Sequence, residues 1–297
     1  MLNSYVRVAK DTSSVFSGIY GVDFSGAKLA GRNTWVARIE PASLRRGRPR
    51  YTLTSLLPLE RACGTAERAT ALSHLVQMIA ESDGALWALD FPFGLPVELM
   101  GPGACWLAQF DLLHACGEDD YGVGLECVRR AQALGLPQHI RRLTDVEAKA
   151  PFDPYHYRII YQTFYGMRDV LGPLRRQRRT AILPFQYRRL HTARRVLVEA
   201  CPASTLKLLG LPHQNYKQPQ GGRLAPKRLR TRRVILNGLS EYVQITEAQR
   251  RVMMRNGGGD ALDAVVAAVG AVRSWQTSDH RLVARHPRYP REGRLFV

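Results

Sequence analysis

Apolar and polar residues alternate along two short segments near the start of the chain, 17–24 and 33–40, and a third segment, 51–57, is a short apolar run. A period of two is typical of β-strands with one buried face, and the turn residues between these segments predict an antiparallel three-strand meander. From 65 to 82 the apolar residues recur every three or four positions, which predicts a helix that ends before Gly84. This part of the chain therefore predicts a small sheet followed by a helix.

Two later segments are apolar nearly throughout, 85–90 and 195–201. Strands of this kind are usually central and buried on both faces, and Pro92 prevents the first one from continuing. The second is followed by a predicted short helix over 203–209. The last strong pattern is an apolar stripe at helical spacing from 260 to about 275, which predicts a long closing helix.

The middle of the chain, from about 101 to 190, is less regular and predicts an insertion or cap. It contains a predicted helix over 155–171 and a basic run, Leu-Arg-Arg-Gln-Arg-Arg, over 174–179. Residues 128–195 carry 15 Lys or Arg against 4 Asp or Glu, so positive charge is concentrated here. A second basic segment, 223–233, contains six Lys or Arg and no acid.

A meander, a helix, a strand, an interruption, a strand and a closing helix form the element order of the RNase H-like fold. We therefore predict an α/β protein with an RNase H-like mixed sheet, in which the antiparallel meander continues into parallel strands flanked by helices. The prediction is a single RNase H-like domain over 1–297, with a helical basic insertion at about 101–190. At 297 residues and 45% apolar composition, the chain is long enough to build such a core.

Five carboxylates each close a predicted strand or open a predicted helix: Asp23, Asp90, Glu199, Asp260 and Asp263. In an RNase H-like sheet the first and fourth strands are neighbours and the final helix begins beside their ends, so these acids would converge. Like charges held close together repel and raise one another's pKa, so a convergent set usually needs cations between its members. We therefore expect Mg²⁺ or Mn²⁺, hard cations that prefer carboxylate and water ligands.

Each of these acids also has a simpler explanation. Asp23 could form an Asx turn with the backbone that follows it, and Asp260 and Asp263 could occupy the N-cap and N3 positions of the final helix. Asp90 and Glu199 lie in apolar strands, where the alternative is a structural ion pair, for Glu199 with one of the many arginines.

The chemistry that this set of acids predicts is hydrolysis of a phosphodiester bond in nucleic acid at a carboxylate-rich two-metal site. Two ions roughly 4 Å apart would activate water and steady the leaving oxygen. We expect all five acids to be catalytic, with Asp23 as the bridging ligand and Asp90, Asp260 and Asp263 as further metal ligands. Glu199 would be an outer ligand or a group that orients water.

The chain has a formal net charge of +18, and 37 of its 43 basic residues are arginines. A surplus of this size attracts polyanions, and the planar guanidinium can bind phosphate with two parallel hydrogen bonds. We expect a nucleic-acid partner, contacted by six arginines of the two basic segments: Arg175, Arg176, Arg178, Arg179, Arg228 and Arg230. Solvated surface charge is the alternative explanation.

The five cysteines are an odd number without C-x-x-C spacing, and they predict neither a disulfide framework nor a zinc ribbon. No apolar run is long enough to span a bilayer, and the first residues lack the apolar core of a signal peptide. We therefore expect a cytoplasmic protein without a membrane partner. The sequence does not indicate an oligomeric state.

Eight motifs are spread over nearly the whole chain: Gly-Val-Asp-Phe-Ser-Gly-Ala-Lys (21–28), Ala-Leu-Asp-Phe-Pro-Phe-Gly-Leu-Pro (88–96), Arg-Leu-Thr-Asp (142–145), Tyr-Gln-Thr-Phe-Tyr-Gly (161–166), Val-Glu-Ala-Cys-Pro-Ala-Ser (198–204), Leu-Gly-Leu-Pro (209–212) with Tyr216-Lys217, Asp-Ala-Leu-Asp-Ala (260–264) and Tyr-Pro-Arg-Glu-Gly-Arg (289–294). Together they resemble the domain of unknown function 429 family, which is regarded as a predicted nuclease family of the RNase H-like superfamily. The resemblance implies this fold and assigns Asp23, Asp90, Glu199, Asp260 and Asp263 as the acidic site residues. The spaced pair at 260 and 263 is similar to the final-helix acids of the RuvC-like branch, which more often has Glu at the position of Asp90.

Two other functions fit parts of the pattern. Actin-like ATPases and sugar kinases also begin with a strand, an acid and a phosphate turn, which Asp23-Phe24-Ser25-Gly26 resembles, although they need two such domains. A non-catalytic RNA- or DNA-binding protein would use the basic segments and the aromatic residues of the insertion, which either stack on unpaired bases or pack in the core: Tyr155, Tyr157, Tyr161, Phe164 and Tyr165. The chain contains no G-x-x-x-x-G-K-[ST], H-E-x-x-H or G-x-S-x-G motif.

Overall fold

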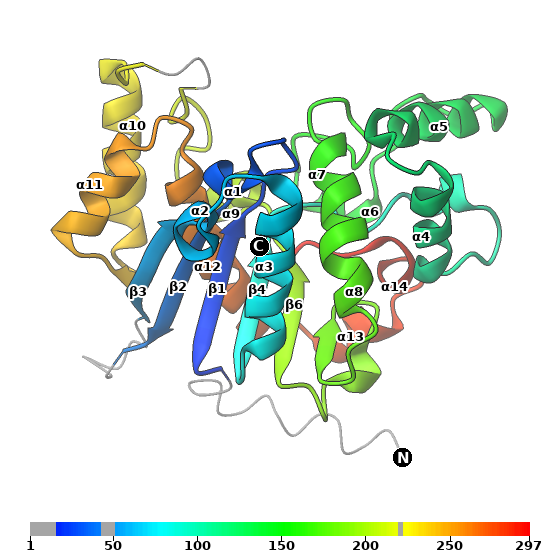
Figure 1. Ribbon diagram of the computed structural model, residues 1–297, viewed down its shortest axis with the longest axis horizontal. Coiled ribbons are helices and arrows are strands. Elements are labelled where there is room, and N and C mark those ends of the chain that lie inside the picture. Colours follow the sequence, from blue (N-terminus) through cyan, green and yellow to red (C-terminus); the bar gives the residue numbers. More distant parts are fainter. Residues whose placement is uncertain (1–15, 43–50, 219–221) are drawn as a thin grey trace.

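The computed structural model describes residues 16–42, 51–218 and 222–297, which form a seven-stranded mixed sheet flanked by helices (Figure 1). The strands are β1 (Gly18–Asp23), β2 (Trp35–Pro41), β3 (Tyr51–Pro58), β4 (Ala85–Leu89), β5 (Thr180–Ile182), β6 (Arg195–Glu199) and β7 (Val243–Gln244), and their order across the sheet is β5-β6-β4-β1-β2-β3-β7. The first three strands are an antiparallel meander, and all other neighbours pair in parallel. The predicted α/β class and mixed sheet are confirmed.

Helices follow most strands, and a group of helices precedes β5 in the segment between β4 and β6. They are α1 (Ala30–Asn33), α2 (Leu59–Cys63), α3 (Arg68–Glu81), α4 (Trp106–Ala115), α5 (Asp120–Ala133), α6 (Leu143–Glu147), α7 (Ile160–Tyr165), α8 (Gly172–Leu174), α9 (Pro202–Leu208), α10 (Pro226–Leu239), α11 (Glu247–Arg255), α12 (Asp260–Thr277), α13 (His280–Arg285) and α14 (Tyr289–Glu292). A π-helical turn (Gly166–Leu171) joins α7 to α8, and two 3₁₀ turns cover Val97–Met100 and Tyr187–Arg189. Within the described ranges, no helix combines the length and the apolar character needed to cross a lipid bilayer.

The central strands send alternate side chains into two buried clusters, one on each face of the sheet. One cluster contains residues of α3, α7 and the π turn together with Val22, Leu89 and Leu197. The other contains most of α12 together with Ile19, Ala88 and Val198. Figure 1 shows the same division, with α3, α7 and α8 in front of the strands and α12 behind them. The face to which a strand residue points therefore decides which group of helices it meets.

Helix α12 approaches β1 closely because β1 has a glycine at the crossing point. A Cβ at Gly21 would overlap the carbonyl oxygen of Ala264 and lie 2.6 Å from the backbone nitrogen of Ala268. Only a residue without a side chain allows this approach. It brings the first turn of α12 next to the end of β1.

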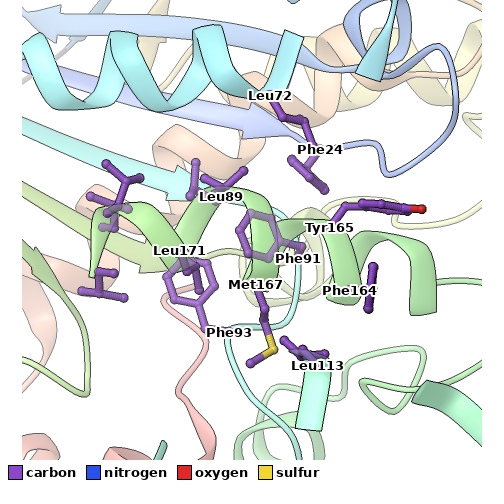
Figure 2. Packing of buried hydrophobic residues seen from close by; sticks show 14 of the residues in the cluster. Phe24, Leu72, Leu89, Phe91, Phe93, Leu113, Phe164, Tyr165, Met167 and Leu171 are labelled. Atoms are coloured by element: carbon purple, nitrogen blue, oxygen red, sulfur yellow. The ribbon is translucent and has the colours of Figure 1, made fainter. Parts of the chain in front are cut away.

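Two phenylalanines anchor the segments that leave β1 and β4. Phe24 and Phe91 are almost fully buried, and their ring centroids lie 4.6 Å apart. Figure 2 shows Phe91 among Tyr165 and Met167, with Phe24 above it. A Cβ at Gly166 would overlap the Phe91 ring, so the π turn also needs a glycine at its closest contact. The insertion thus packs directly on the residues that follow Asp23 and Asp90.

Several sequence predictions need correction. The predicted helix over 155–171 begins only at Ile160, because Tyr155 instead donates its backbone N–H to the Asp153 side chain at 3.2 Å in a preceding turn. The region 101–190 is not only an insertion, since its last part supplies β5, an edge strand too short to show a period. The basic segment 223–233 is mostly helix α10, which the sequence interpretation missed. All five cysteines are free, as expected.

Candidate functional site

Asp23 and Asp90 lie beside each other at the ends of the parallel strands β1 and β4. The backbone N–H of Asp90 donates to the carbonyl of Val22 at 2.9 Å, which continues the parallel pairing of the two strands to their ends. Asp23 follows Ile19 and Gly21 on the face that meets α12, and its side chain is only 8% exposed. The two carboxyl groups are close enough to hydrogen-bond to each other.

The turn after Asp23 is shaped by other side chains. The backbone N–H of Ser25 donates to Thr34 Oγ1 at 3.1 Å, and the hydroxyl of Ser25 accepts from the N–H of Ala27 at 3.3 Å. Within the described part of the chain, no hydrogen bond of an Asx turn is made by Asp23. Its carboxylate is therefore left to face the other acids.

Withdrawal from water changes the proton affinity of this pair. Burial raises the pKa of Asp23 well above its usual value, Lys217 opposes the rise, and the Asp263 and Asp260 charges add to it. Burial raises the pKa of Asp90 to about 7, and the charge of Asp263 contributes further. Burial therefore favours the protonated form of this pair, and a cation that lies against it favours the ionised form.

Asp263, one turn into α12, is engaged by two donors from the loop before α10. Its Oδ1 accepts from the hydroxyl of Tyr216 at 2.9 Å, and its Oδ2 is in direct contact with the ammonium of Lys217. Partial burial lowers the pKa of Lys217, but the Asp263 and Asp23 carboxylates raise it well above its usual value, so this ammonium stays charged. A cation supplied by the chain thus stands among the acids.

Asp260 is the first residue of α12 and does not cap it. The N-cap is Gly259, whose φ of 90° is in the left-handed region, and neither Asp260 nor Asp263 occupies the N-cap or N3 position. The Asp260 carboxylate accepts a long hydrogen bond of 3.3 Å from the amide of Asn256, and burial raises its pKa. The capping alternative is therefore not what the structure contains.

A buried arginine joins the loop that carries Lys217 to the loop that precedes Asp260. Arg232 of α10 donates to the carbonyls of Tyr216 at 2.6 Å, Asn256 at 2.5 Å and Gly257 at 2.8 Å. It is completely buried, although it belongs to a segment that looks like a basic surface in the sequence. Its role is to hold the two loops of the site together.

Glu199 has the ion pair that the sequence left as its alternative. It lies on the same face of β6 as Leu197, so it points to the insertion, whereas Asp23 and Asp90 are on the α12 side. Its two oxygens accept from Arg142 at 2.8 and 2.5 Å, and Arg142 also donates to Asp145 at 2.7 and 3.0 Å. Removal from water lowers the pKa of Arg142, but Asp145 and Glu199 raise it well above its usual value. Burial raises the pKa of Glu199 and Arg142 opposes the rise, so both oxygens of Glu199 have donors within the chain although one guanidinium faces two carboxylates.

All five predicted acids line a single cleft of about 820 Å³. Its floor is formed by the ends of β1, β4 and β6 and the start of α12. One wall comes from the insertion, with Phe152, Arg158 and Gln162, and the other from the 213–217 loop and Arg228 of α10. The structure thus brings together residues that are far apart in the sequence, and pockets of about 300–1,000 Å³ are typical for ligands.

The wall from the insertion is tied to the loop after β1. The amide of Gln162 donates to the carbonyl of Phe24 at 2.8 Å, and a Cβ at Gly26 would overlap the backbone of Tyr161. These contacts come from two of the eight motifs, 21–28 and 161–166. They fix the width of the cleft beside Asp23.

The six predicted phosphate-binding arginines fall into two places. Four of them follow α8 at the amino end of β6, the end of the strand away from the cleft: Arg175, Arg176, Arg178 and Arg179. There the carbonyl of Arg179 accepts a hydrogen bond from the backbone N–H of Arg195, the first residue of β6. This region lies at the bottom of Figure 1, away from the ends of β1 and β4. Arg228 lines the cleft and donates to Gln218 at 2.6 Å, and Arg230 is exposed on the same helix.

A dication fits part of this acid set. Asp23 is buried and Asp90 and Asp260 are half-buried, and among the described residues Lys217 offsets only part of the burial that raises the pKa values of these carboxyl groups. Both oxygens of Asp263 already have donors, and those of Glu199 are held by Arg142. Within the described residues, however, no group of three or more His, Cys, Asp or Glu is arranged so that it could hold a metal ion, so these three aspartates do not form a ready-made metal site.

The sequence interpretation missed the two cations of the site, Arg142 and Lys217. Each occurs in one of the eight motifs, Arg142 in Arg-Leu-Thr-Asp and Lys217 after Tyr216. For Arg142 the available signal was the acid of the same motif, Asp145, whereas the motif of Lys217 contains no acid. No family model, curated protein or solved structure matched this chain when each was searched.

Proposed function

We propose that the protein is a divalent-metal-dependent nuclease that hydrolyses phosphodiester bonds of nucleic acid on an RNase H-like scaffold. The observation that carries the proposal is the Asp23–Asp90 pair. The buried Asp23 and the half-buried Asp90, both with raised pKa values, lie together at the floor of an open cleft, next to two more acids. Crowding of this kind costs free energy, and a bound cation is the usual way to offset it.

The strand arrangement supports the choice of scaffold. An antiparallel meander whose first strand pairs in parallel with β4, which in turn pairs with β6, has the order expected from the sequence. The site also lies at the carboxyl ends of parallel strands, where α/β sheets usually bind their ligands. The nucleic-acid partner and the cytoplasmic location remain part of the proposal.

Asp23, Asp90 and Asp260 are the residues that would hold Mg²⁺ or Mn²⁺. When bound, such an ion would supply Lewis-acid chemistry, making water a stronger nucleophile and stabilising charge on phosphate oxygens. Lys217 forms an ion pair with Asp263, and Arg158 and Arg228 place positive charge on the two walls that face the substrate. A second ion, as the two-metal hypothesis requires, would have to displace the Lys217 ammonium from Asp263.

The proposal is tested with purified protein, Mn²⁺ and a panel of single-stranded, duplex, hybrid and branched substrates. We expect cleavage of at least one substrate, loss of cleavage with chelator, and a drop of more than about a hundredfold in Asp23→Asn and Asp90→Asn, because each removes a proposed metal ligand. Asp111→Asn is the matched control, since Asp111 is an exposed acid on α4 outside the cleft. Absence of cleavage on the whole panel would reject the catalytic proposal.

A non-catalytic nucleic-acid-binding protein is the second candidate, and the Lys217–Asp263 contact favours it. If internal cations satisfied the whole cluster, the acids would be structural. Such a protein should bind nucleic acid equally well in chelator and in Mn²⁺, and calorimetry should detect no Mn²⁺ site that is lost in Asp23→Asn.

The actin-like ATPase alternative is weaker. The turn Asp23-Phe24-Ser25-Gly26 would have to surround a phosphate group. Instead, the backbone of Tyr161 lies against Gly26, in the space where a phosphate loop approaches its nucleotide.

A further inference from the structure

The wall of the cleft that comes from the insertion carries a cluster of rings. Phe152 and His156 have ring centroids 4.5 Å apart, and His156 and Tyr157 are stacked at 4.5 Å. The Arg158 guanidinium lies over both neighbouring rings, 5.8 Å from Phe152 and 5.6 Å from Tyr157. Phe152 and Arg158 form the part of this cluster that lines the cleft.

This cluster differs from three of the aromatic residues that could have stacked on bases, whereas Tyr161 is also exposed. Tyr155, Phe164 and Tyr165 are buried and belong to the core, as the alternative to base stacking required. By contrast, the Tyr157 side chain is 56% exposed, and Arg158 is exposed beside it. Aromatic planes and a guanidinium plane are thus presented to solvent at the edge of the cleft.

The opposite wall offers polar groups with nothing to bind. His213, Gln214 and Asn215 line the cleft, and within the described ranges none of their side chains makes a hydrogen bond, ion pair or ring contact. Gln214 and Asn215 are exposed, and Asn215 holds a φ of 59° in the left-handed region. A side-chain amide offers both donors and an acceptor, which is what the edge of a nucleobase requires.

We propose that this end of the cleft is a nucleobase site: an unpaired base stacks on Phe152 and Arg158, and its edge meets the amides of Gln214 and Asn215. The inference rests on the nuclease function proposed above and specifies its substrate as a strand with unpaired bases. The bases of a regular duplex are stacked on one another and cannot present a free face to a protein ring. Arg158 and Arg228 supply the positive charge that the flanking phosphates need.

The test is a binding measurement in chelator, so that it does not depend on cleavage. Fluorescence anisotropy compares a short labelled single strand, an abasic strand with the same number of phosphates, and a duplex. We expect wild-type protein to bind the strand with bases about tenfold more tightly than the abasic strand, since stacking contributes roughly 1–3 kcal/mol per base. Phe152→Leu keeps an apolar side chain but removes the ring, and Arg158→Lys keeps the charge but removes the planar guanidinium. Each variant should reduce the ratio of the two affinities to below about threefold.

Two exposed residues outside the cleft give matched controls, Tyr121→Leu on α5 and Arg281→Lys on α13. Both should keep the tenfold ratio. Equal binding of the two single strands by wild-type protein, an equal loss on both strands in the variants, or no binding at all would each overturn the base site. Cleavage of a duplex with Mn²⁺ combined with any of these results would retain the nuclease and reject only the base site.

Discussion

Glu199 and Asp90 are neighbours across β6 and β4, where Leu89 pairs with Glu199, but the two carboxyl groups have different surroundings. Glu199 is 1% exposed and receives two hydrogen bonds from Arg142, which also binds Asp145. Asp90 lies against another acid, Asp23, and burial raises its pKa to about 7. We call the first group the compensated set and the Asp23–Asp90 pair the uncompensated set.

The difference indicates which acids stabilise the fold and which belong to the functional site. Removing a charge from water costs several kcal/mol per ion, and this cost must be offset somewhere. In the compensated set the chain supplies the offset, and Arg142 at the same time connects β6 to α6 and to the carbonyl of Glu292 at 3.1 Å. In the uncompensated set Lys217 supplies only part of the offset, and protons or an added cation would supply the rest. Asp263, paired with Lys217, lies between the two cases.

The largest effect is expected from removing the cation of the compensated set. Arg142→Met leaves Glu199 and Asp145 buried without their partner, and the free energy of unfolding should fall by about 3–5 kcal/mol. Urea denaturation measures this, with Arg141→Met as the control, because Arg141 is exposed and should change the value by less than about 0.5 kcal/mol. If the variant does not fold, adding Glu199→Gln and Asp145→Asn should restore folding. A fall below about 1 kcal/mol would remove the distinction between the two sets.

The pH dependence of stability should identify the uncompensated set. The folded pKa of Asp90, about 7, is raised above its usual value of 3.8, so the folded state binds its proton more tightly than the unfolded state does. Stability from this group is therefore complete below pH 3.8 and is lost as the pH rises through about 7. One pKa unit corresponds to about 1.36 kcal/mol, so we expect a loss of about 1–4 kcal/mol over this range in chelator.

Urea denaturation at stepped pH values, in chelator and in excess Mn²⁺, measures this loss. Asp90→Asn should lack most of it, whereas Asp111→Asn should keep it. Excess Mn²⁺ should reduce the loss in wild-type protein by replacing the protons, because a ligand that binds only the folded state stabilises it. The same slope in wild type and in Asp90→Asn would show that the pair is already satisfied.

Tyr216→Phe tests the intermediate case. The variant removes the hydroxyl that donates to Asp263 Oδ1 at 2.9 Å in a buried position, and hydrogen bonds to charged groups contribute about 1.5–3 kcal/mol. Tyr289→Phe is a matched control, because its hydroxyl donates at 2.6 Å to Glu147 at an exposed position and should matter less. Thermal and urea unfolding of both variants give the comparison. If both variants lost the same free energy of unfolding, the hydrogen bond to Asp263 would contribute no more to stability than one at the protein surface.

Much of the arrangement could be predicted from the sequence, because it depends on periodicity. The meander, the strand before Asp90 and the helix from Asp260 follow from periods of two and of three to four residues, and the structure has each within a few residues. The side of the sheet to which Glu199 points could also be predicted, because Glu199 shares a strand face with Leu197. Asp23 shares a strand face with Gly21 and points to the other side of the sheet. Applied to all three strands, the same alternation would have separated Glu199 from the aspartates.

The remainder depends on contacts that no local pattern contains. The Arg142–Glu199 pair spans 57 positions, and Lys217 reaches Asp263 from a loop without regular structure. Strand β5 has three residues, too few to establish a period. Helix α10 was missed because its arginines drew attention to charge, although Ile235, Leu236 and Leu239 form an apolar stripe beside the buried Arg232.

The smallest change in stability, and the sharpest test of the comparison, is expected for Lys217→Met. The Lys217 side chain is 44% exposed, so its ion pair should contribute less than about 1 kcal/mol to unfolding. Its effect on metal binding should be larger, because the variant frees one oxygen of Asp263 and removes a positive charge from the cluster. Titration calorimetry should show one Mn²⁺ bound to wild-type protein and two to the variant, whereas the exposed Lys227→Met of α10 should bind one. Equal numbers and affinities in wild type and Lys217→Met would mean that the ammonium does not occupy the place of an ion, and Asp263 would then belong with Glu199 in the compensated set.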